Sequence, residues 1–122
     1  MEFEVEKNML KNRQSKNIKE NLYQELNRVV DKIKINYQPE KIILFGSLGA
    51  GTSSKTSDID LAIIKKTKKR FLDRNLEVAL IADPLEAFDF LVYTPSEWRE
   101  MQQKDYYFIR EINKGKVLYE KE

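Results

Sequence analysis

The stretch KIILFGSLGAGTSSKTSDIDLAII, residues 41–64, decides how this chain folds. It begins with an apolar run that ends at Phe45 and is stopped by Gly46, and a short apolar run bounded by a turn signal is typical of a buried strand. Residues 46–56 are rich in Gly, Ser and Thr and indicate a turn, with room for a short helix. A second apolar run over residues 59–64 predicts a second strand, so the stretch predicts two strands joined by a turn.

The elements around this stretch follow from hydrophobic spacing. Apolar residues at three- and four-residue intervals predict an amphipathic helix over residues 17–36, with Ser15 as its cap. Pro39 ends that helical run. The later elements are predicted as a helix from 71 to a break at 83–84, a strand at 87–93, a helix from Ser96 to a stop at Gly115 and an edge strand at 117–119.

The length and the order of elements together predict the fold class. A chain of 122 residues fits one small domain, so we expect residues 1–122 to form it, with 1–15 as an N-terminal extension. Because 41% of the residues are hydrophobic, a real core is expected. Helices alternating with strands predict an α/β fold, in which a small mixed β-sheet packs with helices.

Composition excludes several kinds of site. The chain has no cysteine, which excludes disulfides and thiolate metal sites, and no histidine, which removes the usual general base. Any catalysis must therefore use carboxylates, hydroxyls, amines or hard metal ions. A net charge of +2 is too small to indicate a nucleic-acid substrate. Without an apolar run long enough to span a membrane or a signal peptide, a cytoplasmic location is expected.

Three aspartates are candidates for a metal site. Asp58 and Asp60 are two residues apart at the second strand, and period-two geometry sends both side chains to one face. Asp89 interrupts the apolar third strand, where an unpaired charge is costly. Paired carboxylates repel each other, and a hard divalent cation removes that penalty. If the strands are neighbours, three carboxylates converge and can hold two metals about 4 Å apart. The alternative is that they are solvated strand-end residues.

The Gly46-Ser47 turn adds a phosphate-binding candidate. Glycine lets the backbone approach a ligand closely, serine offers a hydroxyl, and a following helix would offer free N–H groups. Together with Asp58-Ile59-Asp60 ten residues later and Asp89 on a later strand, the sequence resembles the DNA polymerase beta-like nucleotidyltransferase superfamily. It is most similar to the minimal nucleotidyltransferases, small stand-alone domains, over about residues 20–120.

This resemblance implies a palm-like nucleotidyltransferase fold and specific roles for the motif residues. Gly46 and Ser47 would hold the triphosphate of ATP or another nucleoside triphosphate. Asp58 and Asp60 would bind two Mg²⁺ ions, or Mn²⁺, while Asp89 would bind the catalytic ion and help deprotonate the acceptor. The implied reaction transfers a nucleoside monophosphate and releases pyrophosphate, by positioning and charge neutralisation.

One position departs from the family pattern. Many relatives carry an arginine before the second glycine of the turn, and here Ala50 occupies that place. Losing a charge-assisted phosphate contact should weaken nucleotide binding. A lysine such as Lys55 or Lys65 is a candidate to compensate.

The acceptor is expected to be a protein. Minimal nucleotidyltransferases often work beside a helical HEPN-type protein, as antitoxins that transfer AMP to a tyrosine of that toxin. Two alternatives stay open: transfer to a small molecule such as an aminoglycoside, and a catalytically weak antitoxin that acts by binding alone, which Ala50 motivates.

Two further features have less specific interpretations. The basic run at residues 65–70 is either a solvated loop or a site for triphosphate or an acidic partner. Tyr93 is expected on the same strand face as Asp89. The aromatic residues Trp98, Tyr106, Tyr107 and Phe108 are interpreted as packing residues or as platforms for a base.

Overall fold

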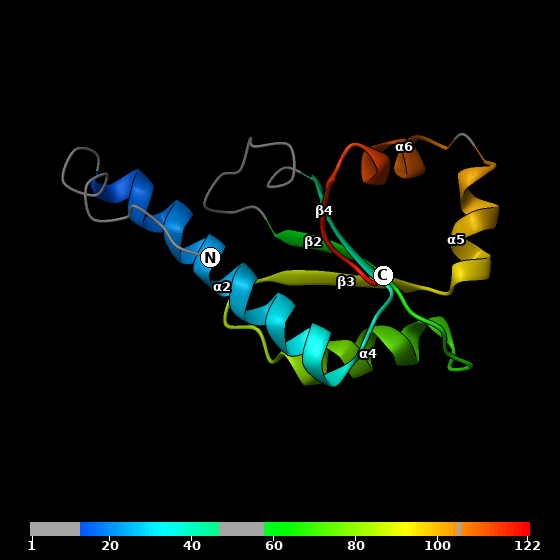
Figure 1. Cartoon of the computed structure of the whole chain (residues 1–122). Coiled ribbons are helices and arrows are strands. Elements are labelled where there is room, and N and C mark those ends of the chain that lie inside the picture. The colour runs from blue at the N-terminus through cyan, green and yellow to red at the C-terminus, as the bar shows by residue number, and fades with distance from the viewer. Residues whose placement is uncertain (1–12, 47–57, 105) are drawn as a thin grey trace.

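The computed structural model describes residues 13–46, 58–104 and 106–122 (Figure 1). Ser47, the rest of the turn with Ala50, and most of the expected N-terminal extension lie outside the described residues. The elements, in chain order, are α2 (Arg13–Asn36), β1 (Lys41–Phe45), β2 (Ile59–Ile64), α4 (Phe71–Ala82), β3 (Phe88–Tyr93), α5 (Pro95–Gln102), α6 (Tyr107–Asn113) and β4 (Lys116–Glu120).

The strands form one mixed sheet in the order β3-β2-β1-β4. β1 runs antiparallel to both β2 and β4, whereas β2 and β3 are parallel. The parallel pair is connected through α4, because parallel strands need a crossover that a tight turn cannot provide. The predicted α/β class and small mixed sheet are confirmed, and β4 is an edge strand as expected.

The larger core lies between one face of the sheet and the helices α2 and α4, which lie side by side below the sheet in Figure 1. On β2, Leu61 and Ile63 point into this core and are fully buried, as the alternation predicts. Val29 and Ile33 of α2 and Val78 of α4 cover them. Apolar burial on this face holds both helices to the sheet.

A smaller core lies on the other face of the sheet, on the side of α5 and α6 (Figure 1). Ile43, Phe45 and Ala62 of the sheet pack there against Ile112 of α6. Apolar side chains cover only part of this face. Asp60 lies two residues before Ala62 on β2, so its carboxylate belongs to the same face. The second face therefore carries both a small core and the candidate site.

Two predicted helix boundaries are wrong. Helix α2 begins at Arg13, so Ser15 lies inside the helix and is not its cap. The single helix expected from Ser96 to Gly115 is two helices, α5 and α6, separated by a short break. Helix α5 ends in tight bonds from the N–H groups of Gln103 and Lys104 to carbonyls three residues earlier. The break lets α5 follow β3 while α6 packs on β1.

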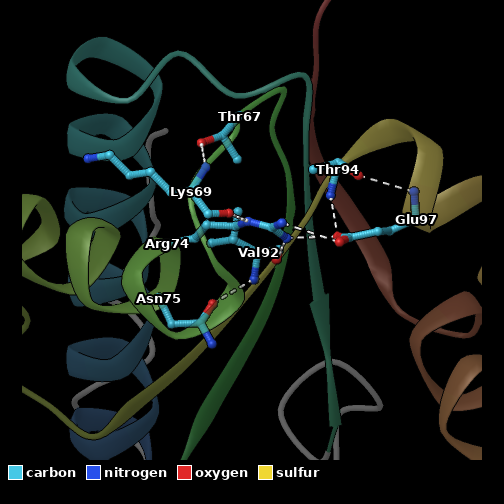
Figure 2. A network of polar contacts seen from close by, with 7 residues as sticks. All are labelled: Thr67, Lys69, Arg74, Asn75, Val92, Thr94 and Glu97. Carbon is cyan, nitrogen blue, oxygen red and sulfur yellow. Dashed lines mark hydrogen bonds and ion pairs between the residues drawn. The ribbon is translucent and has the colours of Figure 1, made fainter.

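A polar network joins α4, the end of β3 and the start of α5 (Figure 2). The buried Arg74 guanidinium donates to the Lys69 and Val92 carbonyl oxygens at 2.7 and 3.3 Å and to the Glu97 carboxylate at 2.7 and 3.2 Å. Glu97 also forms a capping box with Thr94 at the start of α5. One arginine of α4 therefore donates hydrogen bonds to the segment before α4, to β3 and to α5.

None of the helices in the described ranges is both long enough and apolar enough to cross a bilayer.

The Glu97→Gln substitution should lower stability by about 1–2 kcal/mol near neutral pH, because the buried Arg74 loses its charged partner. Hydrogen bonding from Arg74 holds the pKa of Glu97 below its ordinary value. A lowered folded-state pKa contributes stability above the ordinary glutamate pKa that is lost as the pH falls through the folded value. Urea unfolding at several pH values should therefore show the variant approaching wild type in acid.

The matched control is Glu100→Gln, which changes an exposed glutamate of the same helix and should leave the unfolding midpoint nearly unchanged. A Glu97→Gln deficit of the same size at pH 3 and pH 7 would contradict the assignment of this effect to charge.

Candidate active site

The parallel register of β2 and β3 brings two aspartates together. Asp60 of β2 is the direct partner of Asp89 of β3, and neighbouring strands lie about 4.8 Å apart. Both side chains belong to the sheet face opposite α2 and α4, because the residues on either side of each point into the larger core. Asp60 is half-buried and Asp89 is exposed. Asp89 thus lies in an edge strand beside solvent, yet next to a second carboxylate.

Asp58 lies just before the first residue of β2 and is exposed. Its negative charge nevertheless acts on Asp60, two residues later. All three predicted carboxylates therefore lie at the same end of the parallel strand pair. Within the described residues, however, no group of three or more acidic side chains has the geometry of a metal site. The three-carboxylate metal site stays a prediction, and the close pair is Asp60 with Asp89.

The pKa of Asp60 shows the electrostatic cost of this pairing. Burial, followed by the charge of Asp89, a hydrogen bond to Asp89 and the charge of Asp58, raises the pKa of Asp60 to about 6. Each cause penalises the ionised carboxylate. A proton or a cation relieves that penalty, and carboxylate oxygens are the ligands that hard divalent ions prefer. The residues present therefore fit a divalent metal ion.

Gly46 directly follows β1 and lies against Asp60. Its φ is +77°, in the left-handed region that favours glycine. A Cβ atom at this position would collide with Oδ2 of Asp60 and lie 3.2 Å from its Cγ. The antiparallel register pairs the preceding Phe45 with Asp60, which explains the close approach. That Gly46 lets a ligand approach closely stays a prediction, and the group that lies against Gly46 in the structure is the Asp60 carboxylate.

A cavity of about 490 Å³ lies further along the same strand face. Tyr93, four residues after Asp89 on β3, forms one wall, with its ring centroid 5.7 Å from that of Phe71 at the start of α4. Met101 and Tyr106 also line the cavity. Tyr93 lies on the face of Asp89, as predicted. The contribution of Phe71 was missed, since no local spacing relates it to β3 or α5.

Lys65 is not placed to compensate for Ala50. Its Nζ donates to the Tyr37 carbonyl oxygen at 2.5 Å and lies 4.9 Å from the centre of the Tyr37 ring. This contact is at the opposite end of β2 from Asp60, so Lys65 ties the strand end to the segment after α2. Lys55 lies outside the described residues.

A protein family and a solved structure are similar to this chain. The family model described as Polymerase beta, Nucleotidyltransferase matches residues 24–122, a range that contains every predicted site residue. A solved structure from Sulfolobus solfataricus, provisionally described as a nucleotidyltransferase, is similar with a TM-score of 0.57 and 22% identity. The similarity covers 84% of this chain and 92% of that one, and at this identity it shows the fold alone. No curated protein matches the chain.

Replacing Gly46 by alanine should lower stability by about 1–3 kcal/mol, because the new Cβ strains the backbone and collides with Asp60. The double variant Gly46→Ala/Asp60→Ala should recover part of this loss, since it removes the collision and leaves only the backbone strain. Urea unfolding of the four proteins in this cycle measures the coupling. Strictly additive losses would show that the contact between Gly46 and Asp60 is not tight.

Replacing Asp60 by asparagine should raise the Tm of the metal-free protein at pH 7.5 by about 2–4 °C after allowance for solvent screening. A carboxyl whose pKa is raised on folding favours the folded state while protonated, and this contribution is lost as the pH rises through about 6. The gain should disappear at pH 4, where the wild-type side chain is also neutral.

Scanning calorimetry in the presence of a chelator checks this expectation. Asp58→Asn is the matched control, because the exposed Asp58 should change the Tm less. A Tm for Asp60→Asn below that of wild type at pH 7.5 would contradict the repulsion between Asp60 and Asp89.

Proposed function

The chain belongs to the polymerase beta nucleotidyltransferase family, and from this premise we propose that it transfers AMP from ATP to an acceptor hydroxyl. The observation that carries this proposal is the pairing of Asp60 with Asp89 across β2 and β3, beside Gly46, which follows β1. Two neighbouring carboxylates next to a glycine backbone form an arrangement suited to a cation and a phosphate chain.

Two divalent ions, Mg²⁺ or Mn²⁺, are the proposed cofactors. Asp60 and Asp89 would hold them, with Asp58 as a further ligand. Asp58 is exposed and precedes the strand, so its side chain is free of core packing. When bound, such ions neutralise the charge of the triphosphate and act as Lewis acids.

The chain's own residues would position the reactants. The Gly46 backbone, with Ser47 next to it, would hold the triphosphate through N–H and hydroxyl donors. Asp89, which is exposed, would accept the proton of the acceptor hydroxyl. The acceptor oxygen then forms a bond to the α-phosphorus, the bond from that phosphorus to the bridging oxygen breaks, and pyrophosphate leaves with its electron pair.

The proposed acceptor is a tyrosine of a helical HEPN-type partner, with this chain acting as antitoxin. The cavity further along β3 supports a protein acceptor, because it combines apolar and aromatic groups with charged ones: Phe71, Tyr93, Met101 and Tyr106 with Glu97, Glu100 and Lys104. Protein interfaces likewise combine an apolar centre with a polar rim. A binding-only antitoxin is the second candidate, and it is favoured by Ala50 in the phosphate turn.

Titration of ATP with Mg²⁺ into the protein by calorimetry tests the site. Wild type should bind ATP only with the metal, and Asp58→Asn/Asp60→Asn should bind it at least about tenfold more weakly, because the cation loses two anionic ligands. Asp31→Asn, which changes an exposed aspartate of α2, is the matched control and should bind as wild type does. No binding by a folded wild-type protein would overturn the catalytic proposal and favour the binding-only antitoxin.

The same variants can then be used to identify the acceptor. Incubation of a copurified helical partner with ATP and Mg²⁺ should add one adenylyl group to a tyrosine, detected by intact mass and peptide mass spectrometry. The Asp58→Asn/Asp60→Asn protein should leave the partner unmodified. If this double variant still neutralises the toxin fully, neutralisation acts through contact and not through transfer.

A further inference from the structure

Helix α2 carries a buried carboxylate that contacts the segment between α4 and β3 (Figure 1). Glu25 is only 7% exposed, and a buried carboxylate is costly unless it is paired and hydrogen-bonded. Arg28 forms a bidentate ion pair with it, in which Nε and Nη2 lie 2.8 and 2.9 Å from the two carboxylate oxygens. The backbone N–H of Leu85 donates to the same carboxylate. Glu25 therefore joins α2 to the segment that leads into β3.

Arg28 makes a second contact with this segment. Its Nη2 also donates to the carbonyl oxygen of Asp83 at 3.0 Å. Asp83 has a φ of +45°, in the left-handed region that residues other than glycine adopt at a cost. Such a conformation persists where the surrounding structure holds it. Arg28 therefore helps to fix the turn at which the chain leaves α4.

Side-chain burial contributes little to holding residues 83–87 in place. Four of the five side chains are exposed, and that of Pro84 is only partly buried. Proline has no N–H to donate, so Leu85 is the first residue after Asp83 that can donate a backbone hydrogen bond. The Leu85 side chain itself is 80% exposed. The position of this segment therefore depends on the hydrogen bonds between its backbone and α2.

The other end of this segment meets the candidate active site. The Ala87 carbonyl oxygen accepts the N–H of Ile59 at 2.9 Å. Ile59 lies between Asp58 and Asp60, and Ala87 lies two residues before Asp89. The segment held by α2 therefore ends where β2 and β3 begin to pair and where the aspartates lie.

We propose that Glu25 is a positioning residue for the site. By holding residues 83–87 on α2, it fixes where β3 begins relative to β2 and so keeps Asp89 beside Asp60, while Arg28 orients its carboxylate. A displacement of about 1 Å in a reacting group can cost about 100-fold in rate, so such supporting contacts matter to a site. The role in catalysis rests on the proposed function, whereas the effect on the strand pair does not.

The ionisation of Glu25 agrees with this role. The hydrogen bond from Arg28 lowers the pKa of Glu25, and the N–H groups of Leu85 and Glu86 lower it further, although burial acts in the opposite direction. The carboxylate is therefore charged at neutral pH, and a charged acceptor binds backbone N–H groups more strongly than a neutral one.

Amide hydrogen exchange followed by NMR tests the positioning role without any substrate. The Ile59 N–H donates to the Ala87 carbonyl oxygen at the site, and the Lys65 N–H donates to that of Tyr93 at the far end of the same strand pair, both at 2.9 Å. Glu25→Ala should raise the exchange rate of the Ile59 amide at least about tenfold, because the segment opens locally. The Lys65 amide should stay within about twofold of its wild-type rate.

A milder variant and a matched control complete this experiment. Glu25→Gln keeps an acceptor oxygen for the Leu85 N–H and should raise exchange at Ile59 less than Glu25→Ala does. Ile33→Val changes a fully buried core residue of the same helix and should lower the urea midpoint without raising exchange at Ile59 above that at Lys65. If neither Glu25 variant raises exchange at Ile59 above that at Lys65, Glu25 contributes only to global stability and the proposal is overturned.

Calorimetric titration of ATP with Mg²⁺ tests the consequence for the site. Glu25→Ala should bind about tenfold more weakly than wild type, because Asp89 is no longer held in place. Ile33→Val should bind within about twofold of wild type, since its loss of stability does not reach the aspartates. Equal affinity of Glu25→Ala and wild type would overturn the positioning role and leave the proposed function intact. If wild type binds no ATP, the proposed function fails, and the exchange rates alone decide whether Glu25 holds the strand pair.

Discussion

β2 and β3 pair in parallel, and this pairing places both the candidate site and the helix that connects the two strands. It sets Asp60 directly beside Asp89, at a distance where two carboxylates cannot both ionise without cost. A parallel pair also requires a crossover, and α4 supplies it on the face of the larger core. The site and the helix that covers the sheet therefore result from one topological choice.

The hydrogen bonds of the Arg74 guanidinium hold this arrangement together. The guanidinium joins α4 to the end of β3 and to the start of α5, so the crossover helix and the helix after β3 are held to the same strand (Figure 2). A buried guanidinium is costly unless its donors are satisfied, and here carbonyl oxygens and Glu97 satisfy them. The cavity beside Tyr93 takes its walls from α4, β3 and α5 and from Lys104 and Tyr106, which follow α5.

The two faces of the sheet have different roles. On one face, β2 residues such as Leu61 build a continuous core with α2 and α4, and this core provides most of the apolar burial. On the other face, the small core around Ile112 covers only part of the sheet and leaves the aspartates accessible. The pKa of the half-buried Asp60 is raised to about 6, so its ionised form destabilises the fold. The burial of the neighbouring Ile59 and Leu61 on the opposite face offsets this cost.

The sequence alone determined the strands β1 and β2 to the residue and the alternation that turns Leu61 toward the core, because both depend on local apolar pattern. It also indicated the three aspartates through the spacing of Gly46 and the Asp-x-Asp motif. The sequence did not determine the start of α2, because Ser15, the expected cap, lies within a helix that already includes Arg13.

The tertiary structure also decided the division between α5 and α6, because α6 packs on β1 while α5 follows β3. The pairing of Asp60 with Asp89, the contact of Gly46 with Asp60 and the place of Phe71 beside Tyr93 likewise depend on which strands are neighbours. Residue spacing along a chain carries no information on strand order, and for this reason only the tertiary structure could decide them.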